Sequence, residues 1–389
     1  MKHYNFDEIV NRRGTGSYKW DSTGREGVIP LWVADMDFKT APAIIEALRR
    51  RVDHGIFGYT YVPDAYYEAT IDWFRRRHGL ELERDWFIYT SGVVPAISAI
   101  IKALTVPGDG VITMTPVYNC FFSSIRNNGC RLVDNPLIYK DRTYTIDYDD
   151  LERKAADPRN RLLLFCNPHN PAGRVWTPEE MRRVGDICLK HNVIIVSDEI
   201  HCELIMPGYK YTPFASLGGD YLPRVITCSS PSKAFNTAGL QIANIFVSDP
   251  ELRYRIDRAI NDNEVCDVNP FGVAGLIAAY TEGEQWLGEL LVYIAENYRF
   301  LTEFFSERLP EFEVTKLEGT YLAWVNISPT GMDSERLEEY LLAAEKVWVN
   351  AGEMYGEDGR DFIRINLACP RERLLEGLLR LERGLASLR

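Results

Sequence analysis

One lysine of this chain follows a short apolar run and has hydroxylated neighbours. Lys233 comes after the run Val225–Cys228, and Ser230 and Ser232 lie three residues and one residue before it. A lysine held in a walled site can lose its proton and attack a carbonyl carbon. The two hydroxyls could bind a phosphate beside it. Because most lysines are solvated surface charges, this interpretation depends on which other residues surround Lys233.

A second apolar run ends in acidic residues. Asp198 directly follows Val193–Ser197, and Glu199 and His201 come next. An acid at this place is costly to bury without a cationic partner, and a pyridinium N–H would be such a partner. A helix N-cap or a structural ion pair is the ordinary alternative. A metal site of Asp198, Glu199 and His201 would need further ligands, and the sequence offers no second ligand cluster.

Three more apolar runs end in residues that could serve a flat, phosphorylated ligand. The run that ends at Thr90 leads into Gly92, Val93 and Val94 at a predicted helix start, where free N–H groups favour an anion. Tyr118 follows Val111–Met114 and could stack on a ring or pack in the core. Asn170, in a turn with two Asn-Pro pairs, follows Leu162–Cys166 and could donate to a phenolate oxygen.

The elements that carry these residues alternate regularly. Apolar runs at 86–89, 111–114, 162–165, 193–196 and 225–227 alternate with helical patterns, which predicts an α/β fold with a mostly parallel sheet between helices. In such sheets ligands bind at the carboxyl ends of the strands. We therefore expect these residues to share one site.

The regular alternation of strand-like and helical patterns ends at about residue 283. A long helical pattern covers 284–308, strand-like runs follow at 321–327, 347–350 and 362–366, and a last helix carries Leu374, Leu378, Leu381 and Leu385 on one face. We predict an N-terminal segment, 1–42, that joins a small α/β domain formed by 284–389. The large ligand-binding domain would span 43–283.

Composition narrows the class of protein. The 389 residues carry a net charge of −12, which argues against nucleic-acid or anionic-membrane partners. No apolar run reaches the length of a membrane span, and the N-terminus lacks an apolar signal core, so we expect a cytoplasmic protein. Eight cysteines without a C-x-x-C pair predict buried free thiols.

A lysine for a Schiff base together with an acid for a pyridine nitrogen is typical of pyridoxal phosphate (PLP) enzymes. The chain resembles the fold-type I PLP enzymes of the class I/II aminotransferase group. Within that group it is most similar to the cystathionine β-lyase and C–S lyase subgroup of the MalY/PatB type, which includes cystalysin. The resemblance spans essentially the whole chain and rests on these motifs: Lys19-Trp20-Asp21, Trp32-Val33-Ala34-Asp35-Met36-Asp37-Phe38, Gly58-Tyr59, Gly92-Val93-Val94-Pro95, Pro116-Val117-Tyr118, Asn167-Pro168-His169-Asn170-Pro171, Ser197-Asp198-Glu199-Ile200-His201, Ser232-Lys233 and Arg364-Ile365-Asn366.

The resemblance implies a role for each cofactor residue. Lys233 would form the Schiff base, Asp198 would contact the pyridine nitrogen, and Asn170 the phenolic oxygen. The remaining cofactor residues would be Tyr118, stacked on the ring, His201, and a phosphate site made by Gly92, Val93, Val94 and Ser230 or Ser232. No metal is expected.

It also implies a substrate site shared between subunits. Arg364 would bind the substrate α-carboxylate; the alternative for such an arginine is a surface ion pair. Tyr59, in the glycine-rich aromatic loop Gly55–Tyr61, would come from the partner subunit of a homodimer. A Tyr59 that packs within its own subunit is the alternative.

The expected activity is β-elimination from L-cystathionine or related L-cysteine thioethers, which releases a thiol, pyruvate and ammonia. Gln241 replaces the arginine that aminotransferases usually carry eight residues after the lysine, and His201 replaces the tyrosine common in aspartate aminotransferases. Both changes weaken the alternative of an aminotransferase. A regulatory protein that binds a transcription factor is an alternative of another class.

Overall fold

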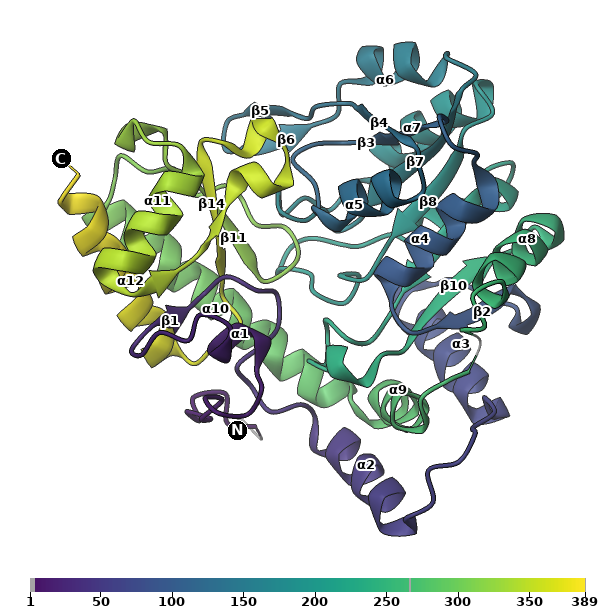
Figure 1. Cartoon of the computed structure of the whole chain (residues 1–389), viewed down its shortest axis with the longest axis horizontal. Helices are drawn as coiled ribbons and strands as arrows, with labels where there is room; N and C mark the ends of the chain where they lie inside the picture. Colours follow the sequence, from purple (N-terminus) through teal and green to yellow (C-terminus); the bar gives the residue numbers. More distant parts are fainter. Residues whose placement is uncertain (1–3, 266, 389) are drawn as a thin grey trace.

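A seven-stranded sheet forms the centre of the chain in the computed structural model, which describes residues 4–265 and 267–388 (Figure 1). Its strand order is β2-β10-β9-β8-β7-β3-β4. Only β10 runs antiparallel to its neighbours, so the predicted mostly parallel sheet is confirmed. The strands are Phe87–Thr90 (β2), Gly110–Thr113 (β3), Arg131–Asp134 (β4), Asn160–Cys166 (β7), Ile194–Asp198 (β8), Val225–Ser229 (β9) and Ala243–Val247 (β10).

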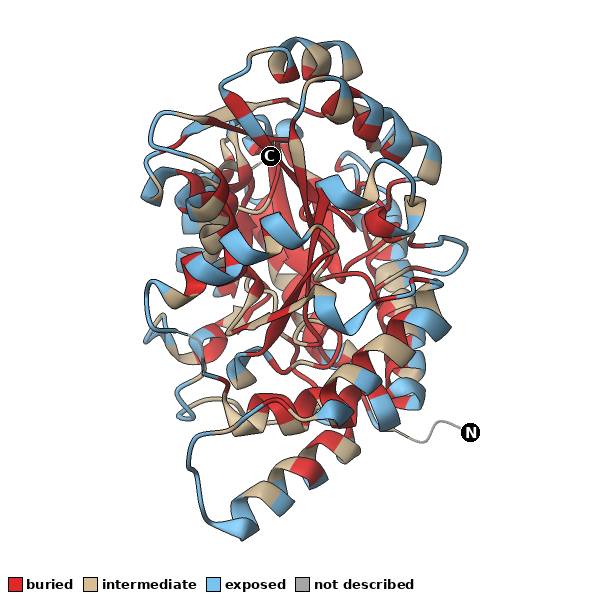
Figure 2. Cartoon of the chain, turned by 90° about the vertical axis from the view of Figure 1, so that its right-hand side faces the viewer, coloured by how far each residue is buried: buried red, intermediate tan, exposed pale blue. Residues whose placement is uncertain are grey.

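Apolar residues cover both faces of this sheet. Along β7, Leu162 and Leu164 belong to one core cluster, whereas Leu163 and Phe165 belong to another. Because successive side chains of a strand point to opposite faces, a strand buried on both faces is a continuous apolar run. The buried residues accordingly concentrate along the central strands (Figure 2).

Helices supply the outer layers of both clusters. Helices α4 (Val93–Leu104), α5 (Cys120–Asn127) and α8 (Pro250–Asn261) pack on one face. Helices α2 (Pro42–His54), α3 (Asp64–His78), α6 (Tyr148–Ala155), α7 (Pro178–Lys190) and α9 (Pro270–Glu282) contribute to the other cluster. The predicted capping box at the start of α7 is present, since Thr177 and Glu180 bond each other's backbone N–H groups.

The C-terminal part forms a second, smaller sheet. It consists of β11 (Leu322–Asn326), β14 (Phe362–Asn366) and β13 (Asn350–Ala351), all antiparallel. Around it lie α10 (Glu284–Arg308), α11 (Ser334–Tyr340) and α12 (Arg371–Ala386), and α12 buries the four leucines predicted to face the core.

The N-terminal segment lies against this C-terminal part. After the short helix α1 (Tyr18–Asp21), β1 (Ile29–Pro30) pairs in parallel with β12 (Val347–Trp348). A separate hairpin joins β5 (Ile138–Lys140) to β6 (Thr143–Thr145). The domain boundaries at 42 and 283 stay predictions.

Two strands of the large sheet were not predicted. The edge strand β4 begins with Arg131 and ends with Asp134, so its apolar signal is short. Strand β10 follows β9 without an intervening α-helix and runs antiparallel to it, so it lies outside the predicted alternation of strands and helices.

Within the described residues, no helix is both long and apolar enough to cross a bilayer. The seven described cysteines are free, and all of them except Cys120 are buried.

Candidate active site

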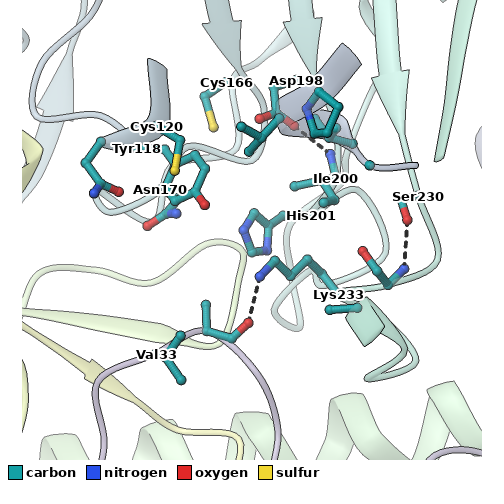
Figure 3. Close-up of a pocket in the computed structure, with 18 of the residues that line it drawn as sticks. Val33, Tyr118, Cys120, Cys166, Asn170, Asp198, Ile200, His201, Ser230 and Lys233 are labelled. Atoms are coloured by element: carbon teal, nitrogen blue, oxygen red, sulfur yellow. Dashed lines mark hydrogen bonds between the residues drawn. The ribbon is translucent and has the colours of Figure 1, made fainter. Parts of the chain in front are cut away.

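A cavity of about 400 Å³ lies at the carboxyl ends of strands β3, β7, β8 and β9 (Figure 3). The predicted site residues that line it are Gly92, Val93, Val94, Tyr118, Asn170, Asp198, His201, Ser230, Ser232, Lys233 and Arg364. Tyr59 does not line it, and its side chain is almost fully exposed, at 99%. Since β7, β8 and β9 are parallel, the residues that follow them meet at one edge, as expected.

Lys233 lies on the loop between β9 and β10. The Ser230 hydroxyl donates to the Ile242 carbonyl over 2.7 Å and accepts the N–H of Ser232 over 3.1 Å, which braces this loop. The Lys233 amine donates to the Ala34 carbonyl over 2.7 Å. Burial, and next the charge of Arg364, lower the pKa of Lys233 to about 8. Its neutral, nucleophilic form is therefore accessible near neutral pH.

Asp198 ends β8 and is only 3% exposed. Its carboxylate accepts the N–H of Ile200 over 3.1 Å. Burial raises the pKa of Asp198 to about 7, although the Ile200 hydrogen bond and the Lys233 charge act in the opposite direction. A cationic N–H donor in the cavity would remove the cost of this buried carboxylate.

Asn170, which follows β7 of the large sheet, and Arg364, on β14 of the small sheet, are hydrogen-bonded to each other. Arg364 Nη1 donates to Asn170 Oδ1 over 3.0 Å, and Nη2 donates to the Trp32 carbonyl over 2.9 Å. Because a guanidinium can only donate, the amide oxygen of Asn170 must face Arg364. The amide NH₂ of Asn170 is then left to donate to a ligand. The guanidinium also lies 4.8 Å from the ring centre of Tyr355.

His201 and Tyr118 add two groups that stay uncharged. His201 is buried, and its Nδ1 has no hydrogen-bond partner within the described chain. Burial, and next the charges of Lys233 and Arg364, hold the pKa of His201 well below its ordinary value. Burial likewise raises the pKa of Tyr118 above its ordinary range. Figure 3 shows His201 between Asn170 and Lys233.

One end of the cavity is suited to an anion. Helix α4 begins at Val93, and the N–H groups of its first turn have no acceptor within the helix. Ser232 also lines the cavity, and its hydroxyl makes no hydrogen bond within the described residues. An anion end, a buried acid, an amide donor and a lysine together fit the phosphate, ring nitrogen, phenolic oxygen and carbonyl carbon of PLP.

Of the three acidic and histidine residues considered as metal ligands, Asp198 and His201 line this cavity and Glu199 does not. The Glu199 carboxylate accepts from the hydroxyls of Ser197 and Tyr211 and from the N–H of Phe214. Glu199 therefore does not line the cavity with Asp198.

A separate group, His78, Cys202 and Glu203, has ligand atoms within 4.8 Å of one another. The Glu203 oxygens already bond Trp73 Nε1 (2.6 Å), Arg77 Nε (2.8 Å) and His78 Nε2 (2.6 Å). This group is an ion-pair cluster of the core.

Several lining residues had no predicted role. They are Tyr18, Trp32, Val33, Ala34, Ser91, Cys120, Cys166, Ile200, Gln241, Asn350, Met354 and Tyr355, among others. The motif around Trp32 contributed to the family resemblance, but it follows no strand of the large sheet. Asn350, Met354 and Tyr355 come from the small sheet and its following loop, which no strand-end argument includes.

Comparisons with known proteins agree with this geometry. A family model described as aminotransferase class I and II matches residues 26–381. The chain is 41% identical to cystathionine beta-lyase PatB of Bacillus subtilis, over 98% of this chain and 100% of that protein. It superimposes on cystalysin from Treponema denticola, which contains pyridoxal 5'-phosphate, with a TM-score of 0.97 at 38% identity, covering 99% and 100% of the two chains. The PLP-bound C–S lyase from Staphylococcus hominis gives 0.93 at 34% identity, covering 98% and 99%.

Proposed function

Because the chain belongs to the aminotransferase class I and II family, we propose that it is a PLP-dependent C–S β-lyase that acts on L-cystathionine or related L-cysteine thioethers. The observation that carries this proposal is the single cavity lined by Lys233, Asp198, Asn170 and Arg364. The relatives named for this activity support it over their full lengths. The reaction breaks the bond between Cβ and sulfur and yields a thiol, pyruvate and ammonia.

Bound PLP would supply a ring that withdraws the negative charge developing at the substrate Cα. Asp198 would keep a ring nitrogen protonated, and its buried carboxylate would gain the cationic partner it lacks. The NH₂ group of Asn170 would donate to the phenolic oxygen, since its own oxygen is bonded to Arg364. Tyr118 would pack against the ring face, and neutral His201 would lie beside it.

Other lining residues would bind the two anionic groups, the phosphate of PLP and the α-carboxylate of the substrate. The first N–H groups of α4, at Val93 and Val94, and the Ser232 hydroxyl would bind the phosphate. Arg364 would bind the α-carboxylate with the part of its guanidinium that faces the cavity. The Lys233 amine would take the proton from Cα, and its lowered pKa leaves a neutral fraction near neutral pH.

We also propose a two-fold homodimer with shared sites. The loop 55–61 exposes Ile56, Phe57, Tyr59 and Tyr61, and contiguous exposed apolar side chains are characteristic of interaction surfaces. A partner subunit at this loop would place Tyr59 at the neighbouring cavity. The cytoplasmic location expected from the sequence stays a prediction.

Turnover without a keto acid tests the proposed function. Purified protein incubated with L-cystathionine is expected to produce pyruvate continuously. An aminotransferase would instead stop after one half-reaction unless a keto acid were added.

A further inference from the structure

The segment Trp32–Asp37, here called the strap, lies against the cavity through its backbone carbonyls. The Trp32 carbonyl accepts from Arg364 Nη2 (2.9 Å) and from Asn350 Nδ2 (3.2 Å). The Ala34 carbonyl accepts from the Lys233 amine (2.7 Å) and from the Tyr321 hydroxyl (3.0 Å). The dashed line from Lys233 in Figure 3 ends at this strap. Both cations of the proposed reaction therefore bond the same short segment.

Two asparagine side chains, one from β14 and one from the loop that carries Lys233, form hydrogen bonds with the strap. Asn366, on β14, donates to the carbonyls of Val33 (2.6 Å) and Asp35 (2.7 Å). Asn236, three residues after Lys233, accepts the Met36 N–H and donates to the Met36 carbonyl, over 3.0 and 2.9 Å. The loop that carries Lys233 and the strap that receives its amine are thus bonded to each other.

A buried ion cluster anchors the end of the strap. The fully buried Asp37 carboxylate contacts Arg12 (2.8 Å), Lys19 (3.2 Å) and Arg373 (3.5 Å) and accepts from Trp20 Nε1 (2.8 Å). A buried charge this well paired strongly resists displacement. These contacts join the motifs around Lys19 and Asp37, although neither of these two residues lines the cavity.

Tyr321 is the second donor to the Ala34 carbonyl. It is fully buried, its ring lies edge-on to His201 at 6.1 Å, and burial raises the pKa of its hydroxyl, so it remains a donor at all ordinary pH values. A carbonyl oxygen that already accepts one hydrogen bond has less charge to offer a second donor.

We propose that the Ala34 carbonyl is the acceptor for the free amine of Lys233, and that Tyr321 is a positioning residue that fixes this carbonyl and limits how strongly it stabilises the ammonium form. The proposal rests on the proposed function only for the role of that amine. The hydrogen-bond arrangement stands on the contacts above.

Other groups also act on the Lys233 amine and stay unchanged in the test. They are Arg364 on β14, Asp198 at the end of β8, Asp35 on the strap, Cys120 on α5, and His201 after β8. A change confined to Tyr321 therefore reports on the shared carbonyl.

The test measures the protonation of Lys233 in the full chain after removal of any cofactor. Brief acetylation with acetic anhydride between pH 6 and 10, followed by mass spectrometry of the Lys233 peptide, gives the pKa of its amine, with exposed Lys210 as internal reference. In Tyr321→Phe the carbonyl has one donor fewer, so the pKa of Lys233 is expected to rise by about half a unit. Tyr298→Phe removes a hydroxyl that donates to the Thr315 carbonyl away from the cavity, and it should leave the profile unchanged.

A backbone change tests the Ala34 carbonyl itself, and it should shift the pKa of Lys233 in the opposite direction to Tyr321→Phe. An ester in place of the amide between Ala34 and Asp35, introduced by ligating a synthetic N-terminal peptide, weakens the Ala34 acceptor and should lower the pKa of Lys233. If the pKa of Lys233 is unchanged in both Tyr321→Phe and the ester-containing protein, the proposal is wrong. If Tyr321→Phe does not fold, an unchanged pKa of Lys233 in the ester-containing protein alone overturns it. Because no turnover is measured, loss of the proposed lyase activity would not be mistaken for either result.

Discussion

Asn170 accepts a hydrogen bond from Arg364 over 3.0 Å, and this contact joins the turn after β7 of the large sheet to β14 of the small sheet. Both residues are buried. The contact orients the Asn170 amide and fixes one end of the guanidinium, so a single hydrogen bond couples the proposed cofactor site to the proposed carboxylate site.

Arg364→Ala should weaken the binding of all amino acid substrates alike. The lost carboxylate contacts and the unpaired Asn170 oxygen correspond to about 3 kcal/mol, or roughly a 100-fold rise in KM. Steady-state kinetics with thioethers of different leaving groups measure this rise, and Arg364→Lys, which keeps the charge without the planar fork, is the matched control. An effect limited to one leaving group would instead place Arg364 at the side-chain pocket.

Asp198→Asn should slow turnover by about 10³-fold, because a neutral amide does not keep a ring nitrogen protonated. The same variant should also change the pH dependence of the free energy of unfolding of the cofactor-free protein. Urea unfolding at several pH values measures this change.

The pKa of Asp198 is raised from 3.8 to about 7 in the folded chain. The folded state therefore binds more protons than the unfolded state between these values, and this contribution to stability is lost as the pH rises from about 4 to 7. Asn does not titrate, so the Asp198→Asn variant should gain about 4 kcal/mol of folding stability relative to the native chain across that window. If the free energy of unfolding changed with pH in the same way for the native chain and for Asp198→Asn, the pKa of Asp198 would not be raised by folding, and the prediction would be wrong.

The sequence was sufficient to predict that Asp198, Asn170 and Lys233 share one cavity. Asp198, Asn170 and Lys233 each follow a strand of one parallel sheet, and parallel strands bring the residues at their carboxyl ends together whatever the loop lengths. The strap was not predictable in this way. Its cavity contacts are backbone carbonyls, which leave no residue-type signal, and their donors Arg364 and Asn366 lie more than 300 residues along the chain. The spacing of residues also could not predict the position of Tyr59, whose side chain is exposed and does not line the cavity of its own chain.

Glu203→Gln should destabilise the fold without affecting the reaction chemistry. Pairing with His78 and Arg77 outweighs burial and lowers the pKa of Glu203 from 4.5 to about 2. Its stabilising contribution is complete above pH 4.5 and is lost as the pH falls towards 2. Breaking this buried cluster should cost about 3 kcal/mol at pH 7 and less at pH 3, measured by urea unfolding.

Glu152→Gln is the control for this cluster, because Glu152 pairs with Lys190 and His191 near the surface and should matter little. Zinc should not raise the melting temperature of the native protein, since the Glu203 oxygens are already bonded. A clear rise that Glu203→Gln removes would identify a metal site instead.

Mixed dimers should test whether Tyr59 crosses the subunit interface. Co-expression of Lys233→Ala chains with Tyr59→Ala chains gives dimers in which, if Tyr59 crosses, one site carries both defects and the other is native. Random pairing then restores about one quarter of the native activity. If Tyr59 serves its own chain, every site of the mixed dimer carries one defect and activity stays at the level of the separate variants.

The fate of the substrate carbon skeleton distinguishes a C–S β-lyase from an aminotransferase. L-cystathionine incubated with the purified, PLP-loaded protein and no keto acid should give pyruvate, ammonia and thiol in equal amounts over many turnovers, and Lys233→Ala should lower this rate by at least about 10³-fold. Mass spectrometry of the products makes the measurement. Formation of the keto acid with the intact cystathionine skeleton, in an amount equal to the enzyme and without pyruvate, would contradict the account and identify a transaminase.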